Sequence, residues 1–234
     1  MRKDIYSLIP EAALNHHGAT KLDIEKFKKY YQHVVSQVYD EGDSPFHKSL
    51  TVKVVDEVIL PLGLPKDSVI YDLGCGPGYF LDKMSNAGYT NLTGITFSQQ
   101  DRTLCRQNGH TVKEMDISFL DVADSEIDFI FSRHSLEHSP FPYITLMEYN
   151  RALKLGGLMY VEVPSPGDTR KHEFNVNHYS VLGADMWKAL FVRSGFDIIT
   201  TSPIVANLTN TKTGQKFNET YYMFVLRNKW KLSI

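Results

Sequence analysis

A glycine-rich turn holds the most informative residues of this 234-residue sequence. Residues 69–73 read as a buried strand, and Gly74, Gly76 and Gly78 follow it at alternate positions. Because glycine lacks a Cβ, such a backbone can turn tightly and approach a ligand closely. In an open α/β sheet the ligand crevice lies beyond the carboxyl ends of the strands, where this turn would sit. The spacing therefore predicts a small-molecule site between residues 72 and 78.

The order of residues in the turn narrows the class of ligand. A dinucleotide-binding turn has the pattern Gly-x-Gly-x-x-Gly, whereas the third glycine here comes one residue earlier. Asp72 stands two residues before Gly74, where a carboxylate would repel a pyrophosphate and attract an ammonium group. The turn therefore favours a ligand with an amino group, while a nicotinamide or nucleotide-sugar enzyme of related fold is an alternative.

Apolar strands alternate with amphipathic helices on both sides of this turn. This is the arrangement that places a site at the ends of strands. The pattern predicts helices over residues 22–39, 45–60, 79–87, 98–108, 141–153 and 184–194. It predicts strands over residues 69–73, 92–96, 111–115, 127–132, 158–163, 196–201 and 221–227. Such alternation indicates an α/β fold with a mainly parallel sheet. The last two strands are joined by residues 207–214, which contain no helix, and are expected to pair as an antiparallel hairpin.

Residues 71–78, Tyr-Asp-Leu-Gly-Cys-Gly-Pro-Gly, closely resemble the first motif of the class I S-adenosylmethionine (SAM)-dependent methyltransferases. Residues 68–202, approximately, follow the order of elements in that family. The resemblance implies a Rossmann-like fold with a seven-stranded, mainly parallel sheet, a C-terminal antiparallel hairpin and SAM as cofactor. We expect residues 1–64 to form an N-terminal helical extension or lid and residues 65–234 to form the SAM-binding methyltransferase domain.

The resemblance also assigns residues to the methionine and ribose parts of SAM. Gly74, Cys75 and Gly76 would lie against the cofactor, and Asp72 would organise its methionine end. At the end of the second strand the family usually has an Asp or Glu that binds both ribose hydroxyls, and here the position is taken by Thr96. A threonine hydroxyl cannot replace a charged bidentate acceptor.

The residues after Thr96 could supply the missing acceptor. Phe97 follows directly, and Asp101 lies one helical turn further along. This arrangement resembles the ribose-binding segment of the cyclopropane fatty acid synthases, in which Asp101 is the closest match. A solvated helix start is the alternative reading of residues 99–101.

Further strand ends complete the predicted cofactor site. After the third strand, Asp116 would accept a hydrogen bond from the adenine amino group, and Ile117 would pack on the ring. At the end of the fourth strand, Ser132 and Arg133 would line the methionine side through backbone groups.

Two histidines near the expected methyl group are candidate catalytic bases. Residues 136–138, Leu-Glu-His, and residues 153–157, Leu-Lys-Leu-Gly-Gly, resemble a broad family of small-molecule methyltransferases. Transfer to a hydroxyl requires alignment of the acceptor and removal of a proton. His134 and His138 suit that step because the pKa of histidine lies near neutrality. The alternative for both is a structural role in the turn.

A polar loop over residues 164–179 follows the fifth strand at the same edge. Such loops often carry substrate contacts, so His172 and His178 are predicted to contact the acceptor. Tyr30 would join them if the first helix acts as a lid. His172, Glu173 and His178 could bind a metal, but their spacing matches no strong metal signature, and no metal site is predicted.

Composition excludes several classes of partner. The net charge is −2 and basic residues are dispersed, so duplex nucleic acid is not an expected ligand. No apolar run is long enough for a membrane span, and Cys75 and Cys105 read as free thiols, which together predict a cytoplasmic protein. The sequence carries no signal for an oligomeric state.

The sequence therefore predicts an enzyme that transfers a methyl group from SAM to an oxygen, nitrogen or carbon atom of a small molecule. The alternative, supported by the missing ribose carboxylate, is a non-catalytic SAM-binding regulatory or partner protein.

Overall fold

A computed structural model describes residues 21–36, 44–209, 214 and 216–232 of the chain. The chain divides into two units, Met1–Tyr39 and Asp40–Ile234. In the first unit the described segment contains helix α2 (Lys21–Val35). Helix α3 (Pro45–Val54) lies in the second unit and contacts its other elements. The boundary between residues 64 and 65 stays a prediction.

The described part of the second unit is built on a seven-stranded sheet, as the sequence predicted. The strand order is β3-β2-β1-β4-β5-β7-β6. Neighbouring strands from β3 to β5 are parallel, and β7 pairs antiparallel with both β5 and β6. The strands are β1 (Ile70–Leu73), β2 (Leu92–Ile95), β3 (Thr111–Lys113), β4 (Ile127–Arg133), β5 (Leu153–Pro164), β6 (Phe196–Thr209) and β7 (Lys216–Asn228).

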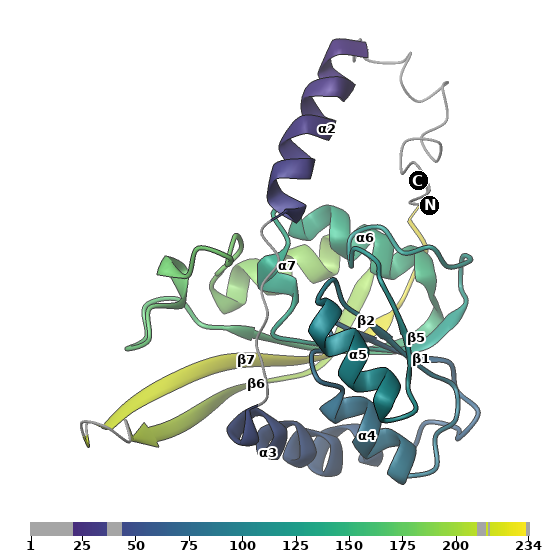
Figure 1. Ribbon diagram of the computed structural model, residues 1–234, viewed down its shortest axis with the longest axis vertical. Helices are drawn as coiled ribbons and strands as arrows, with labels where there is room; N and C mark the ends of the chain where they lie inside the picture. Colours follow the sequence, from purple (N-terminus) through teal and green to yellow (C-terminus); the bar gives the residue numbers. More distant parts are fainter. Residues whose placement is uncertain (1–20, 37–43, 210–213, 215, 233–234) are drawn as a thin grey trace. The chain divides into compact units, whose positions relative to one another are not determined.

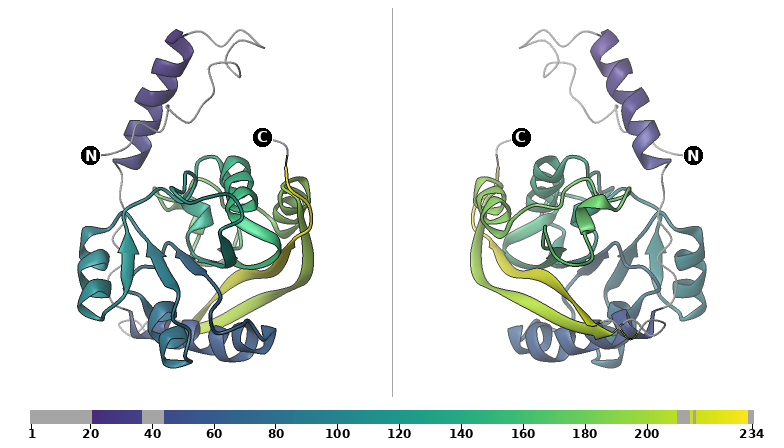
Figure 2. Two further views of the ribbon diagram at one scale, coloured as in Figure 1. Left: turned by 90° about the vertical axis from the view of Figure 1, so that its right-hand side faces the viewer. Right: turned by 90° about the vertical axis from the view of Figure 1, so that its left-hand side faces the viewer.

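Helices cover both faces of this sheet (Figures 1 and 2). One apolar cluster joins the sheet to α3, α4 (Tyr79–Asn86) and α5 (Gln99–Gln107). The other joins it to α6 (Pro142–Ala152) and α7 (Ala184–Arg193). Successive strand residues enter opposite clusters, as the pleat of a strand requires. In β4, for example, Phe129 and Phe131 belong to the first cluster, whereas Ile130 between them belongs to the second.

Short helical turns complete the described unit and refine one prediction. The predicted helix over residues 45–60 is α3 followed by a π-helical turn, η2 (Val55–Ile59), and a 3-10 turn, η3 (Leu60–Leu62). Gly63 then ends it in the left-handed conformation, with φ 68°. Two further 3-10 turns, η4 (Leu136–His138) and η5 (His172–Phe174), lie after β4 and after β5.

The C-terminal hairpin is longer than the sequence predicted. β6 and β7 extend to the pair Thr209–Lys216, so residues 207–209 belong to the strand rather than to the connection. Beyond the pair Pro164–Tyr221, the described residues of β7 pair with β6 alone, and the two strands project from the sheet as a ribbon (Figure 1). Apolar and polar residues do not alternate regularly along residues 204–209 and 216–220, so the pattern used to predict strands is weak there.

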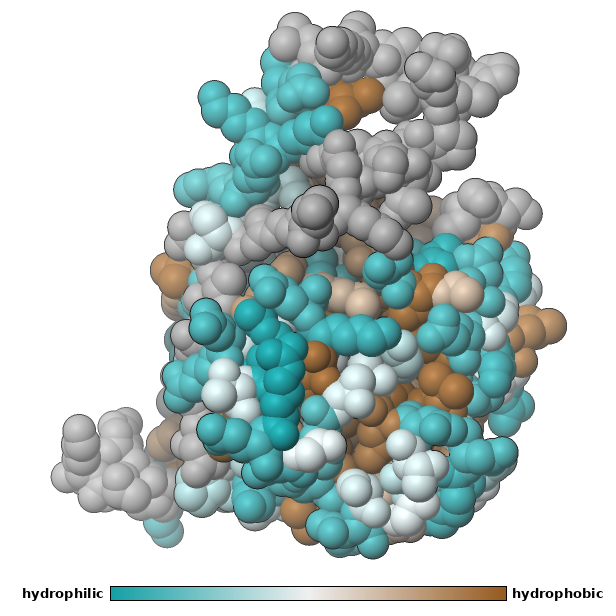
Figure 3. Space-filling view, turned by 45° about the vertical axis from the view of Figure 1, so that its right-hand side comes forward, coloured by the Kyte–Doolittle hydropathy of each residue, from teal (hydrophilic) through white to brown (hydrophobic). Residues whose placement is uncertain are grey.

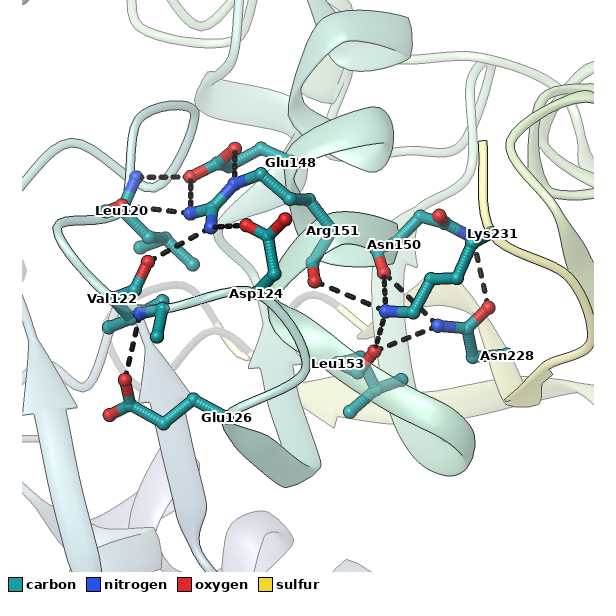
Figure 4. Close-up of polar contacts among 11 residues, drawn as sticks. Leu120, Val122, Asp124, Glu126, Glu148, Asn150, Arg151, Leu153, Asn228 and Lys231 are labelled. Carbon is teal, nitrogen blue, oxygen red and sulfur yellow. Dashed lines mark hydrogen bonds and ion pairs between the residues drawn. The ribbon is translucent and has the colours of Figure 1, made fainter. Parts of the chain in front are cut away.

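Arg151, near the end of α6, ties the loop after β3 to the helix (Figure 4). Its guanidinium donates to both carboxylate oxygens of Glu148 at 2.7 and 2.8 Å and to Asp124 at 2.6 Å. It also donates to the carbonyls of Leu120 and Val122 at 3.0 and 2.9 Å. This loop begins at the predicted adenine-binding residues, so Arg151 helps to hold them in place.

Arg151→Ala is therefore expected to destabilise the domain. Loss of these charge-assisted bonds leaves the part-buried carbonyls of Leu120 and Val122 without this donor and leaves Glu148 with the Leu120 N–H alone, at a cost of about 2–3 kcal/mol. The midpoint of thermal unfolding should fall by roughly 4–10 °C in differential scanning calorimetry. Lys188→Ala is the control, because Lys188 on α7 makes an exposed pair with Asp185 and should change stability by less than about 0.5 kcal/mol. Equal shifts in the two variants would contradict the role given to Arg151.

The surface carries dispersed apolar residues. Large exposed apolar side chains come from separate segments, among them Leu155, Phe174 and Val205. On the face drawn in Figure 3, apolar residues form small groups between hydrophilic ones. Among the described residues, no helix has the length and apolar character needed to cross a membrane.

Candidate active site

The glycine-rich turn lies where the strand order reverses. β1 is flanked by β2 on one side and by β4 on the other, and all three run parallel. In open α/β sheets the ligand crevice forms at such a reversal, outside the carboxyl ends of the strands. Residues 74–78 follow β1 directly and fill this position.

Two of the three glycines are required by packing. Gly74, Gly76 and Gly78 all have positive φ angles, of 84°, 47° and 90°. A Cβ on Gly74 would lie 2.4 Å from Cβ of Ser135, and one on Gly78 would lie 2.9 Å from Sγ of Cys105. A Cβ on Gly76 would meet no atom within 4 Å. Gly76 thus exposes bare backbone to open space, as a ligand approaching the turn requires.

Asp72 is a buried carboxyl group directly behind this turn. It lies in β1 between Gly94 of β2 and Phe131 of β4, and it is 3% exposed. Burial raises its pKa to about 8, although the charge of Arg133 acts in the opposite direction. A carboxyl group so far from water gains strongly from a cationic partner.

Cys75 points its side chain into the core rather than toward the open side of the turn. Its thiol would crowd a Cβ on Gly94 at 2.7 Å. Cys75 and Cys105 are both buried and free, and the Cys105 thiol donates to the Gly76 carbonyl at 3.4 Å. The predicted contact of Cys75 with a cofactor could therefore involve only its backbone.

The predicted ribose-binding segment is held rigidly at the end of β2. Ser98 caps α5 by accepting from the backbone N–H of Asp101 at 3.1 Å. Arg102 donates to the carbonyls of Thr96 and Phe97 at 3.3 and 2.6 Å. Asp101 lies in the first turn of α5 and is buried.

Asp116 and Ile117 occupy the loop after β3. One carboxylate oxygen of Asp116 accepts from the backbone N–H of Ser118 at 2.6 Å. Ser118 in turn bonds to the Thr145 hydroxyl of α6 at 2.7 Å. Ile117 is half-buried and packs against the core cluster. Both predicted adenine contacts thus stand on a loop anchored to α6.

A buried ionic cluster lies at the ends of β4 and β5. Nε of Arg133 lies 2.9 Å from Oε1 of Glu162, and Nε2 of His134 lies 3.0 Å from the same oxygen. The Tyr160 hydroxyl donates to the other oxygen at 2.6 Å. Burial alone would raise the pKa of Glu162, but Arg133, His134 and Tyr160 together lower it to about 2.

His134 is held between two carboxylates. Its backbone has a positive φ of 53°, and its Nδ1 lies 3.6 Å from Oε1 of Glu137. Burial and the charge of Arg133 act to lower its pKa, yet the bonds to Glu137 and Glu162 outweigh them and raise it. The ring therefore keeps its proton to a higher pH than a free histidine does, which favours a donor over a base.

His138, His172 and His178 form a continuous set of rings beside Glu137. The His138 and His178 ring centres are 4.8 Å apart, and those of His172 and His178 are 5.6 Å apart. His138 Nδ1 lies 2.9 Å from the carbonyl of Asn177. Burial lowers the pKa of both His172 and His178, the latter to about 4.

Comparison with known proteins agrees with this geometry. Residues 71–161 match a family described as Methyltransferase domain. These residues are similar to the class I methyltransferases, and the second unit, which contains them, is called the methyltransferase domain. An uncharacterised methyltransferase of Mycobacterium bovis is 28% identical over 141 residues, which cover 55% of this chain and 52% of that protein. The 27-O-demethylrifamycin SV methyltransferase of Amycolatopsis mediterranei is 24% identical over 68% of this chain and 65% of that protein.

The fold of the methyltransferase domain has counterparts among solved structures. A SAM-dependent methyltransferase from Archaeoglobus fulgidus superimposes with a TM-score of 0.61 and 14% identity, over 77% of this chain and 94% of that one. At this identity the likeness shows the fold alone. The chain spans about half the length of the Mycobacterium bovis relative that it matches.

Most of the residues predicted for the site of the methyltransferase domain come together. Those assigned to the cofactor lie at the carboxyl ends of β1, β2, β3 and β4, and His134, His138, His172 and His178 form one group. Tyr30 is 66% exposed on α2 of the first unit, which is described by itself, so its predicted substrate contact stays a prediction.

Two buried carboxylates of the methyltransferase domain were not predicted from the sequence. Glu162 is 1% exposed in β5, and Glu137 is 1% exposed in η4. A glutamate within the apolar strand Met159–Val163 was a usable signal, because a buried charge needs partners. The role of Glu137 depended on a loop more than 30 residues later, which no local pattern indicates.

Proposed function

We propose that the methyltransferase domain binds SAM along the Asp72–Gly78 turn and supports methyl transfer to a small-molecule acceptor. The observation that carries this proposal is the open backbone face at Gly76 beside the buried carboxyl group of Asp72. When bound, SAM supplies a methyl group on a positively charged sulfur.

The chain's own residues fit the parts of this cofactor. Asp72 would bind its ammonium group directly or through water. Thr96 and Asp101 would accept hydrogen bonds from the ribose hydroxyls, and Asp116 would accept from the adenine amino group. Their placement at successive strand ends of one sheet edge supports this order. Phe97 and Ile117 would contribute apolar contacts.

We assign acceptor binding to the group of histidines around Glu137. The group lies after β4 and in the loop after β5, at the same sheet edge as the turn. A small-molecule acceptor is supported by the name of the rifamycin-type relative. A cytoplasmic location is supported by two buried, free cysteines, which are typical of a reducing compartment.

The test combines binding with turnover. Isothermal titration calorimetry should detect SAM and its demethylated product, S-adenosylhomocysteine. Isotope-labelled SAM should then yield labelled product with at least one member of a panel of hydroxyl, amine and activated-carbon acceptors. Binding without any transfer would support the non-catalytic SAM-binding alternative. Thermal stabilisation by NAD but not by SAM would overturn the proposal.

A further inference from the structure

Three side chains outside the SAM-binding turn meet in an arrangement suited to a metal ion. Glu137 and His138 belong to η4, and His178 belongs to the loop that follows η5. One ligand atom from each of the three lies within 4.8 Å of the other two. They come from segments about 40 residues apart, so the cluster is a product of the tertiary fold.

Two atoms of this cluster are buried without a hydrogen-bond partner among the described residues. They are Oε2 of Glu137 and Nδ1 of His178. A buried polar atom left unpaired costs about 1–3 kcal/mol, so such atoms are rare in native structures. Two such atoms in one cluster point to a bound ligand, and His178 offers an electron pair at Nδ1 once its proton is on Nε2.

The cluster is also held in place by bonds to groups outside it. His138 Nδ1 is 2.9 Å from the Asn177 carbonyl, so it donates there and its Nε2 carries the lone pair. Metal-binding histidines characteristically make such a bond through the nitrogen that does not bind the metal. The backbone N–H groups of Tyr179 and Ser180 donate to the Glu137 carbonyl at 2.9 and 3.0 Å. These bonds fix the loop carrying His178 to the turn carrying Glu137.

We propose that Glu137, His138 and His178 bind one divalent transition-metal ion. Two imidazoles and one carboxylate suit Zn²⁺, Co²⁺, Mn²⁺ or Fe²⁺ better than Ca²⁺ or Mg²⁺, which prefer oxygen ligands. Three protein ligands leave coordination positions for water or for an oxygen of the acceptor. In that role, which rests on the proposed methyl transfer, the ion would lower the pKa of an acceptor hydroxyl, whose proton leaves to water.

Asn175 contacts the ring nitrogen of His178 that would not bind the metal ion. Its Nδ2 lies 3.2 Å from Nε2 of His178, and its Oδ1 accepts from the backbone N–H of Asn177 at 3.1 Å. Coordination through Nδ1 puts the proton of His178 on Nε2, which then needs an acceptor. Asn175→Asp supplies one oxygen for His178 and keeps one for Asn177, so it should tighten metal binding. A purely structural role for Asn175 predicts no such gain.

The test measures binding of Co²⁺ alone to the untagged chain, by calorimetry and by its visible absorption. We expect one Co²⁺ per chain, an affinity at least about 10-fold weaker in Glu137→Gln and His178→Ala, and a several-fold gain in Asn175→Asp. His110→Ala is the matched control, because His110 is not part of the cluster. Its Nε2 lies 2.6 Å from Oδ1 of Asp82. This variant should bind Co²⁺ as the parent chain does.

Circular dichroism and S-adenosylhomocysteine binding report whether each variant is folded and keep this test separate from the proposed methyl transfer. No Co²⁺ binding by the parent chain at millimolar concentration would overturn the metal site. Unchanged Co²⁺ affinity in folded Glu137→Gln and His178→Ala would overturn it as well.

Discussion

Gly76→Ala is expected to weaken the binding of SAM and S-adenosylhomocysteine by about 10- to 100-fold while the domain stays folded. The added Cβ meets no protein atom within 4 Å, so it does not disturb the packing of the turn. It occupies instead the space in which the cofactor would approach the backbone. Overpacking of this kind costs about 1–3 kcal/mol, and each 1.4 kcal/mol corresponds to a tenfold change in affinity. Calorimetric titration measures the loss.

Gly88→Ala separates this effect from backbone strain. Gly88 has a φ of 88°, compared with 47° for Gly76, and a Cβ there also meets nothing within 4 Å. Both substitutions place alanine in a conformation that costs roughly 1–2 kcal/mol in stability. Only Gly76→Ala should lose cofactor affinity. A Gly76→Ala variant that binds SAM as tightly as Gly88→Ala does would show that the cofactor does not lie against this turn.

Asp72→Asn is expected to stabilise the ligand-free protein and to abolish most of its SAM binding. The folded-state pKa of Asp72 is raised from 3.8 to about 8. The folded protein therefore retains a proton that the unfolded chain loses, and the stability contributed by this group falls as the pH rises from about 4 to 8. Asparagine has no such penalty, so the gain at pH 7 should be on the order of 2–4 kcal/mol. Urea unfolding at pH 5 and pH 7.5 should show the larger gain at the higher pH.

The same carboxyl group predicts the pH dependence of SAM binding. Below pH 8 the free protein holds Asp72 mostly neutral, whereas an ammonium ligand is bound best by the carboxylate. Binding then releases a proton, and affinity should rise by up to about tenfold per pH unit between pH 6 and 8. In Asp72→Asn the affinity should be low and should lack this rise. If Asp72→Asn bound SAM like the parent at every pH, Asp72 would not be a residue of the SAM site.

The fold around the turn was predictable because local sequence determines it. The spacing of Gly74, Gly76 and Gly78 after an apolar strand specifies a strand, a tight turn and a helix. Ser98 and Gly109 mark the ends of α5 for equally local reasons, a cap and a left-handed residue. Parallel strand order then brings the separate strand ends to one edge.

The histidine cluster was only partly predictable. His134, His138, His172 and His178 were each recognisable as polar residues after a strand, but Glu137, which lies beside His134, His138 and His178, was not. Its contacts depend on the backbone bonds of Tyr179 and Ser180, which fix a distant loop to η4. The raised pKa of His134 likewise depends on Glu162 in another strand. Such long-range contacts have no periodic signature in the sequence.

A crystal structure with S-adenosylhomocysteine bound would show where the cofactor lies on the sheet edge. We predict that the amino group of the ligand lies within direct or single-water hydrogen-bond reach of Asp72, that its chain crosses Gly76, and that its adenine lies beside Asp116 and Ile117. Density for the ligand at any other part of the domain, with the turn left open, would rule out the Asp72–Gly78 turn as the cofactor site.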